Sequence, residues 1–340
     1  MSNSQPTAVR EAPIIKKITG SQATAMALDE AMGMDPTVLL LGEDVADREG
    51  GGILKATRGL STKYGNRVRS TPISEQAIVG AAVGAAIAGM RPVAEIMLMN
   101  FITLAMDQLV NHAAKIRYMS GGKTSVPLTL RTMSGCGTSN GGQHSDMLEA
   151  WLAHTPGLKV VAPSNPADQK ALLLSCIFDD NPCVFIETTM LMMAQGPAPE
   201  AGYTVPLGKA KVLRAGTDVT VISYGRPVSD ALAVAEAMAS EGVSVEVIDL
   251  RTIVPMDRET VLNSVGKTKR AVIVHEAVTA YGVGAEISAV IYEHLFSDLK
   301  SPIQRVGAKY TPVPFSQPLE KAFMWSQDRI RASIARTLGS

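Results

Sequence analysis

Two polar side chains in this sequence stand where they could transfer protons. Glu75 opens a predicted helix over 75–89, in which Gly80, Gly84 and Gly89 leave one nearly bare face. A carboxylate in the first turn of a helix can simply offset the helix macrodipole. It can also be presented at the edge of a sheet, where α/β proteins usually bind their ligands. The spacing alone slightly favours the first interpretation, and both stay open at this point.

His144 and Phe101 are two further candidates for a functional site. His144 lies in a polar loop, GGQHSD at 141–146, which is flanked by glycine and serine and leads into a predicted helix. Most lone loop histidines are only solvated, but this placement between apolar segments favours acid–base chemistry, because imidazole titrates near neutral pH. Phe101 follows the predicted strand that carries Met97. An aromatic residue there is more often part of a core than a platform for a cofactor.

The composition argues against several other kinds of site. Lys plus Arg and Asp plus Glu both number 32 among 340 residues, and aromatic residues make up 4%, so a nucleic-acid-binding surface is not expected. The three cysteines form no CxxC pair and the five histidines no HExxH motif, which disfavours a zinc site or a disulfide framework. In YGVGAEI (281–287), Ile287 stands where a dinucleotide-binding fingerprint has its third glycine. The segment is therefore only weak evidence for a dinucleotide-binding site.

No segment of the sequence predicts a membrane span. The weakly polar stretch 77–90 is too short to cross a bilayer and consists mostly of small residues. The first 17 residues have neither the apolar core of a signal peptide nor the Arg-rich pattern of a transit peptide. Because the cysteines also suggest a reducing compartment, the sequence predicts a soluble, cytoplasmic protein.

The hydrophobic periodicity predicts an α/β protein, because short apolar strands alternate with helical segments. In the first half we expect strands at 38–42, 92–97, 126–131, 158–164 and 183–187, and helices at 21–33, 75–89, 101–119 and 166–178. Asn165 followed by Pro166 is a typical start signal for the last helix. In the second half we expect strands at 218–225, 243–250 and 271–276, and helices near 227–240 and 284–296.

The segment 194–208 is rich in Pro, Gly and Ala and lacks periodicity, so it is interpreted as a linker. It would join a domain over 1–193 to a smaller one over 209–340. At 340 residues the chain is long enough for about two domains.

A set of collinear motifs points to one family. They are LGEDVA (41–46), RVRSTPISE (67–75), AAVGAAIAGMRPVAEI (81–96), QHS (143–145), PGLKVVAPS (156–164), LLLSCIFDDNPCVFIE (172–187), VEVIDLRTIVPMD (245–257) and SVGKTKRAVIVHEA (264–277). Over nearly its whole length the chain resembles the β subunit of the thiamine-diphosphate-dependent E1 component of 2-oxo acid dehydrogenase complexes. That family includes the pyruvate, branched-chain 2-oxo acid and acetoin enzymes. The resemblance implies two three-layer α/β/α domains, a transketolase-like pyrimidine-binding domain and a transketolase C-terminal domain.

The resemblance also implies a role for each candidate residue. Glu75 matches the glutamate that hydrogen-bonds N1′ of the cofactor's aminopyrimidine, and His144 matches a histidine that steers protons and helps transfer to a lipoyl group. Three positions match residues that pack around the pyrimidine ring: Ile73, Met97 and Phe101. Five positions match a potassium site built largely from main-chain oxygens: Leu128, Cys176, Ile177, Asp179 and Asn181.

The sequence contains no GDG motif, which in thiamine enzymes helps to hold the diphosphate through Mg²⁺. By resemblance that half of the site belongs to a separate α subunit, in an α2β2 heterotetramer whose C-terminal β-subunit domain docks the E2 acyltransferase.

Departures from the family at 138–142 (TSNGG) and 188–196 (TTMLMMAQG) leave the substrate open, although Phe101 and TPVPFS (311–316) favour pyruvate or acetoin. A heteromeric thiamine-dependent lyase or carboligase without E2, and a non-catalytic scaffold, remain as alternatives.

Overall fold

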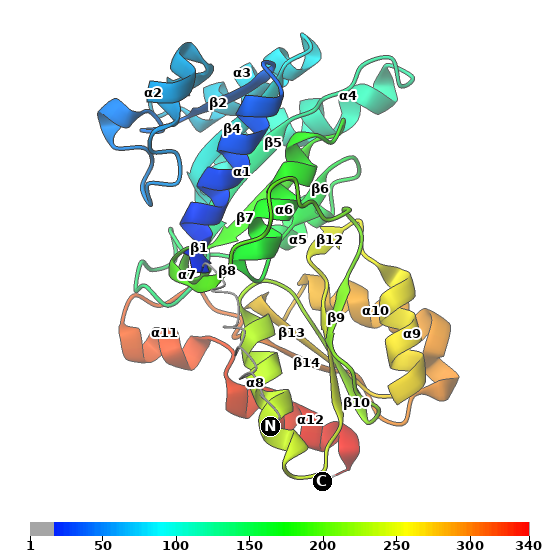
Figure 1. The fold of residues 1–340 in the computed structure, drawn as a ribbon. Helices are drawn as coiled ribbons and strands as arrows, with labels where there is room; N and C mark the ends of the chain where they lie inside the picture. The colour runs from blue at the N-terminus through cyan, green and yellow to red at the C-terminus, as the bar shows by residue number, and fades with distance from the viewer. Residues whose placement is uncertain (1–16, 340) are drawn as a thin grey trace, which may run out of the picture.

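A computed structural model describes residues 17–339 and contains two large sheets, each with helices packed against it (Figure 1). The first sheet has seven strands in the order β12-β6-β7-β5-β4-β2-β3. Their bounds are β2 Val38–Gly42, β3 Val68–Ser70, β4 Arg91–Leu98, β5 Thr129–Ser134, β6 Lys159–Val161, β7 Cys183–Thr188 and β12 Thr252–Val254. All pairs except β12 with β6 are parallel, so the carboxyl ends of six strands meet at one edge.

The second sheet has five strands in the order β14-β13-β10-β11-β9, of which only β9 is antiparallel to its neighbour. Their bounds are β9 Lys211–Arg214, β10 Val219–Ser223, β11 Val245–Asp249, β13 Ala271–Val278 and β14 Gln304–Ala308. A separate antiparallel pair joins β1 Lys17–Thr19 to β8 Gln195–Pro197.

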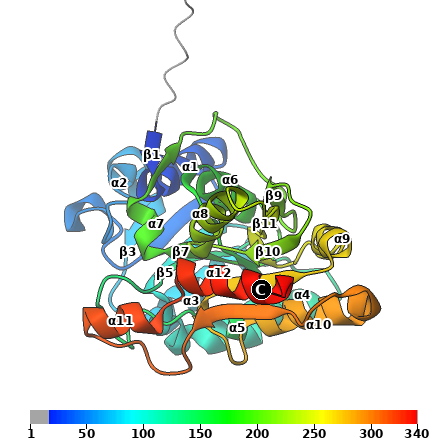
Figure 2. The same ribbon diagram turned by 90° about the horizontal axis from the view of Figure 1, so that it is seen from below.

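Helices cover both faces of each sheet, which confirms the predicted three-layer arrangement. On the first sheet, α1 (Gly20–Met34) and α6 (Pro166–Ile177) pack on one face and α3 (Glu75–Ile87) on the other. On the second, α8 (Pro227–Ala239) and α12 (Gln327–Leu338) face α9 (Arg258–Thr268) and α10 (Val283–Leu295) across the sheet. Figure 2 shows these last helices from below, with α11 set off to one side.

Several short helical segments complete the fold. They are η1 Asp47–Glu49, α2 Leu60–Tyr64, η2 Gly65–Arg67, η3 Met99–Ala105, η4 Gln108–Ala113, α4 Ala114–Met119, α5 Glu149–Ala153, α7 Thr189–Met193, η5 Phe296–Asp298 and α11 Gln317–Phe323. Within residues 17–339 no helix is both long and apolar enough to cross a membrane.

Two of the long helices of the first half, α1 and α6, begin at a side-chain cap. The Asn165 side chain accepts a hydrogen bond from the Asp168 backbone N–H, and Pro166 occupies the first turn, as predicted. Thr19 and Gln22 form a reciprocal capping box at the start of α1. Each side chain satisfies a backbone donor that the first helical turn leaves without a partner.

Two of the predicted elements are wrong in detail. The helix expected at 101–119 is divided into the 3-10 segment η3, the π-helical segment η4 and the short α4. The strand expected at 126–131 lies three residues further on, as β5. The apolar run that suggested it, Val126 and Leu128, is buried in the core ahead of the strand, so burial and strand pairing do not coincide.

The two halves share one continuous core. A single apolar cluster includes Ile78 and Leu158 from the first half and Ile248 and Ile287 from the second. Within the expected second domain, β12 leaves the second sheet and pairs with β6 of the first. The Arg251 guanidinium, which directly precedes β12, forms a buried ion pair with Asp168 at 2.8 Å. The expected linker 194–208 likewise contains β8, which pairs back to β1.

Candidate active site

Two carboxylates meet at the carboxyl-end edge of the first sheet. Glu43 directly follows β2, and Glu75 is the first residue of α3, the helix that follows β3. Partial burial, and then the negative charges of Glu75, Asp44 and Glu95, raise the pKa of Glu43 above its usual value. This edge therefore carries a local excess of negative charge.

Glu75 is buried without a hydrogen-bond donor. Its exposed fraction is only 7%, yet no described residue donates a hydrogen bond to its side chain. Its carboxylate oxygens are not among the fully buried atoms that lack a partner, so they are accessible at this edge while the rest of the side chain is covered. The site therefore fits a ligand that brings its own N–H or N–H⁺ donor to this carboxylate. The aminopyrimidine ring of thiamine diphosphate has that chemistry.

Phe101 and His144 are brought together at the end of β4. Their rings lie edge to face, with centroids 5.5 Å apart and an interplanar angle of 81°. Asn100 holds the two segments in place, because its side-chain amide donates to the Gly142 carbonyl at 3.1 Å and to the Asp146 carboxylate at 2.9 Å. The backbone N–H of Asp146 donates back to the Asn100 side chain. The loop that carries His144, residues 135–148 between β5 and α5, is named the His144 loop below.

The His144 imidazole faces an open hollow of about 450 Å³. The hollow is lined by Asn140, Gly142, Gln143 and His144 and by Phe315, which comes from the C-terminal half and is 73% exposed. Among the described residues, no side chain hydrogen-bonds the imidazole. Its ring nitrogens are therefore available to a bound substrate, as an acid–base role requires.

The other two residues expected around the pyrimidine lie differently. Ile73 is 81% exposed in the loop before α3, so within this chain it packs against little. Met97 lines a small internal space of about 10 Å³ with Glu95, Arg131 and Met133. That volume holds about one water molecule. The structure thus brings Phe101 to His144 but gives Ile73 and Met97 separate surroundings.

A buried charge cluster, missed from the sequence, lies beneath this edge of the sheet. Arg131 on β5 donates to Glu95 on β4 at 2.6 Å and to Glu187 on β7 at 2.7 Å. Thr24 donates a further hydrogen bond to Glu187 at 2.6 Å. Burial raises the pKa of Glu95, and Arg131 opposes that rise. Each of the three apolar strand segments contains one charged residue, and this pattern in the sequence could have revealed the cluster.

The five positions matched to a potassium site lie around the end of α6 and the turn before β7. They are Leu128, Cys176, Ile177, Asp179 and Asn181. The Arg91 guanidinium already donates to the carbonyl oxygens of Ile177 at 3.3 Å and Asp179 at 3.1 Å. Although burial opposes ionisation, hydrogen bonds from Lys159 and Asn181 lower the pKa of the Asp179 carboxyl. Carbonyl and carboxylate oxygens suit a hard cation. Two of the carbonyl oxygens, those of Ile177 and Asp179, already have the Arg91 guanidinium beside them.

Among residues 17–339, no three His, Cys, Asp or Glu side chains come together as a group that could hold a metal ion. Glu95 and Glu187 are paired with Arg131, and Glu43 and Glu75 stand at the sheet edge. The potassium site that the resemblance implies would use mainly main-chain oxygens, which such a side-chain group does not include.

The comparisons with known proteins agree with this geometry. Residues 16–195 match the family model for the transketolase pyrimidine-binding domain, and residues 208–330 match that for the transketolase C-terminal domain. The chain is 43% identical over 331 residues to the β subunit of acetoin:2,6-dichlorophenolindophenol oxidoreductase from Cupriavidus necator, covering 95% of this chain and 98% of that one. It is 45% identical over 314 residues to the mitochondrial pyruvate dehydrogenase E1 β subunit of Dictyostelium discoideum, covering 91% and 88%.

A solved structure supports the fold independently. A split-gene transketolase superposes with a TM-score of 0.77 at 20% identity, covering 95% of this chain and 98% of that chain. At that identity the likeness concerns the fold alone. Together with the two family models and the relatives above 40% identity, it shows that this chain belongs to the transketolase-like family of E1 β subunits from the thiamine-diphosphate-dependent pyruvate and acetoin dehydrogenases.

Proposed function

We propose that this chain supplies the pyrimidine side of a thiamine diphosphate site, with a separate α subunit supplying the diphosphate and Mg²⁺ side. The observation that carries the proposal is the Glu75 side chain, which is largely covered at the sheet edge and whose carboxylate has no donor among the described residues. The missing GDG motif supports the division of the site. When bound, thiamine diphosphate supplies a carbon nucleophile that attacks the carbonyl of a 2-oxo acid or acetoin.

The residues of this chain would then have distinct tasks. Glu75 accepts a hydrogen bond from N1′ of the aminopyrimidine, which favours the form of that ring able to take up a proton. Phe101 packs its ring edge to face against His144 and so helps to hold the imidazole in place. His144 is placed beside an open hollow, where its imidazole can donate or accept a proton at the substrate oxygen.

We further propose that the acyl unit passes to the lipoyl group of an E2 acyltransferase and that two αβ pairs form an α2β2 heterotetramer. The substrate is proposed to be pyruvate or acetoin, in line with the names of the relatives. In this proposal residues 1–193 form the pyrimidine-binding domain, 194–208 the linker and 209–340 the C-terminal domain. Residues 1–16 and 340 lie outside those that the structure describes.

A structural potassium ion and a cytoplasmic location are also proposed. The ion would be held by the main-chain oxygens around 176–181, and exchange of potassium for sodium should lower the thermal midpoint of the αβ complex if they bind it. The location is supported by three free, buried cysteines and is tested by cell fractionation.

The role of His144 is tested in the αβ complex with His144→Ala. We expect the rate of transfer to a lipoyl acceptor to fall by about 10²-fold, because the proposed task of the histidine is in the transfer of the acyl unit to the lipoyl group. The rate of decarboxylation, measured with an artificial electron acceptor, should fall less. The wild-type complex, assayed with pyruvate and acetoin in turn, is the reference for both. An equal loss in the two assays would count against a handover role. A wild-type complex that turns over substrate but never acylates lipoyl groups would favour the lyase alternative.

A further inference from the structure

The first half of the His144 loop is held by a carboxylate from the other half of the molecule. Glu320, on α11, is only 2% exposed. Its Oε1 accepts a hydrogen bond from the backbone N–H of Gly137 at 2.8 Å, and its Oε2 accepts one from the backbone N–H of Ser139 at 3.1 Å. The Ser139 hydroxyl also reaches Glu320 Oε2, at 3.4 Å. One side chain therefore fixes two peptide groups of the loop, one before Gly137 and one before Ser139.

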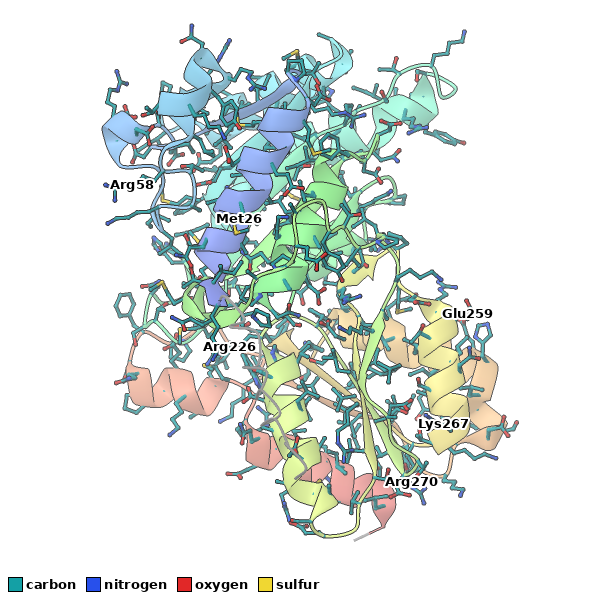
Figure 3. All side chains as sticks on the ribbon, in the orientation of Figure 1. Met26, Arg58, Arg226, Glu259, Lys267 and Arg270 are labelled. Carbon is teal, nitrogen blue, oxygen red and sulfur yellow. The ribbon has the colours of Figure 1, made fainter. Side chains whose placement is uncertain are left out.

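Two more side chains of the C-terminal half hold the preceding residue, Cys136. Glu276 accepts a hydrogen bond from the Cys136 N–H at 2.7 Å, and Arg226 donates to the Cys136 carbonyl at 2.9 Å. Arg226 lies at the start of α8, where the two halves of the molecule meet (Figure 3), and its guanidinium lies 5.1 Å from the Trp325 ring centroid. Side chains from several elements of the C-terminal half thus hydrogen-bond the backbone of residues 136–139.

The backbone between these bonds adopts a conformation that needs outside support. Ser139 has a φ of +57°, in the left-handed region that non-glycine residues rarely occupy. Such a conformation persists only where its surroundings determine it, and both Ser139 donors point to Glu320. Two residues further on, Gly141 lies against the Phe315 ring, at a φ of +73°. Glu320 is therefore the group whose loss should most directly free this part of the loop.

We propose that Glu320 is a positioning residue, which fixes the His144 loop so that the imidazole is correctly placed beside the reacting carbon. This inference rests on the proposed role of His144. The far side of the loop remains tied to the end of β4 by Asn100. Loss of Glu320 therefore misplaces His144 without detaching the loop from Phe101. In this arrangement the C-terminal domain contributes to the chemistry through the loop that it holds, besides any part in assembly.

The test compares Glu320→Ala and Glu320→Gln in the αβ complex, with His144→Ala and the double variant His144→Ala/Glu320→Ala. Because a misplacement of about 1 Å can cost up to about 10²-fold, we expect Glu320→Ala to slow lipoyl acylation by about 10-fold or more. Decarboxylation and the affinity for thiamine diphosphate should change less than about threefold. Glutamine keeps the shape and one acceptor oxygen, so its loss should be intermediate. Glu259→Ala, an exposed carboxylate on α9 labelled in Figure 3, is the matched control.

The double variant separates positioning from a structural effect. If Glu320 acts through His144, adding Glu320→Ala to His144→Ala should cost almost nothing further in lipoyl acylation. A full additional loss in the double variant, or an equal loss of decarboxylation, would overturn the proposal. If Glu320→Ala does not fold, the same selective loss must appear in Glu320→Gln, and its absence there would be equally decisive. A harmful His144→Ala with a harmless Glu320→Ala overturns only this inference, whereas a harmless His144→Ala overturns the proposed role of His144 as well.

Discussion

Replacing Glu75 by glutamine is expected to lower the turnover of the αβ complex by about 10²-fold or more. Glutamine has nearly the same shape, but its amide cannot accept the N1′ hydrogen bond with a full negative charge. No described residue donates a hydrogen bond to the wild-type carboxylate, so glutamine breaks no hydrogen bond within the chain. The thermal midpoint of the variant should therefore be close to that of the wild type.

The measurement is the turnover number at saturating thiamine diphosphate and Mg²⁺, together with the thermal midpoint of the same preparation. Glu200→Gln is the matched control, because Glu200 is an exposed carboxylate outside the sheet edge. Near-normal turnover in Glu75→Gln would remove the catalytic role and leave only helix capping. A loss of turnover that merely follows a loss of folded protein would have the same meaning.

Replacing Arg131 by methionine is expected to destabilise the chain by about 3–5 kcal/mol. Arg131 is the cation between the buried carboxylates of Glu95 and Glu187, at 2.6 and 2.7 Å. Methionine fills much of the same volume but leaves two like charges buried side by side. The unfolding midpoint in urea measures the loss. Arg58→Met, at an exposed arginine at the edge of the molecule in Figure 3, should change stability by less than about 0.5 kcal/mol.

The pH dependence of the Arg131→Met loss identifies its cause. Without the guanidinium, the pKa of the buried Glu95 carboxyl in the folded chain rises further above its value in the unfolded chain. The penalty is therefore full above this raised folded-state pKa and fades as the pH falls toward the unfolded value. The variant should be less impaired at about pH 5 than at about pH 8. An equal loss at both pH values would assign the effect to packing rather than to charge.

The parts of the fold with strong local signals could be predicted from the sequence. The strand Val38–Gly42 lies where the apolar run places it, and α6 begins at Pro166 after its Asn165 cap. The helix expected at 101–119 could not be predicted in its true form. There Asn100 and Met99 bind the His144 loop, and the chain forms 3-10 and π segments that no propensity favours.

The candidate site depended on the resemblance more than on local pattern. Spacing alone left Glu75 as either a cap or a ligand, because neither its burial nor its lack of a donor is visible in the sequence. The His144 loop is hydrogen-bonded by Glu320, which lies 183 residues after Gly137 in the sequence. The pairing of β12 with β6 is likewise a contact between distant segments. Such contacts are determined by the packing of the two halves, which periodicity does not describe.

The most direct test of the account is calorimetric titration of thiamine diphosphate with Mg²⁺, first into this chain alone and then into its complex with the α subunit. The divided site predicts binding only in the complex, because this chain contributes the Glu75 side and lacks a GDG motif for the diphosphate. Glu75→Gln in the complex should weaken that binding or leave it intact while turnover falls. Tight binding by the chain alone would reveal a complete cofactor site within it and contradict the proposed division between two subunits.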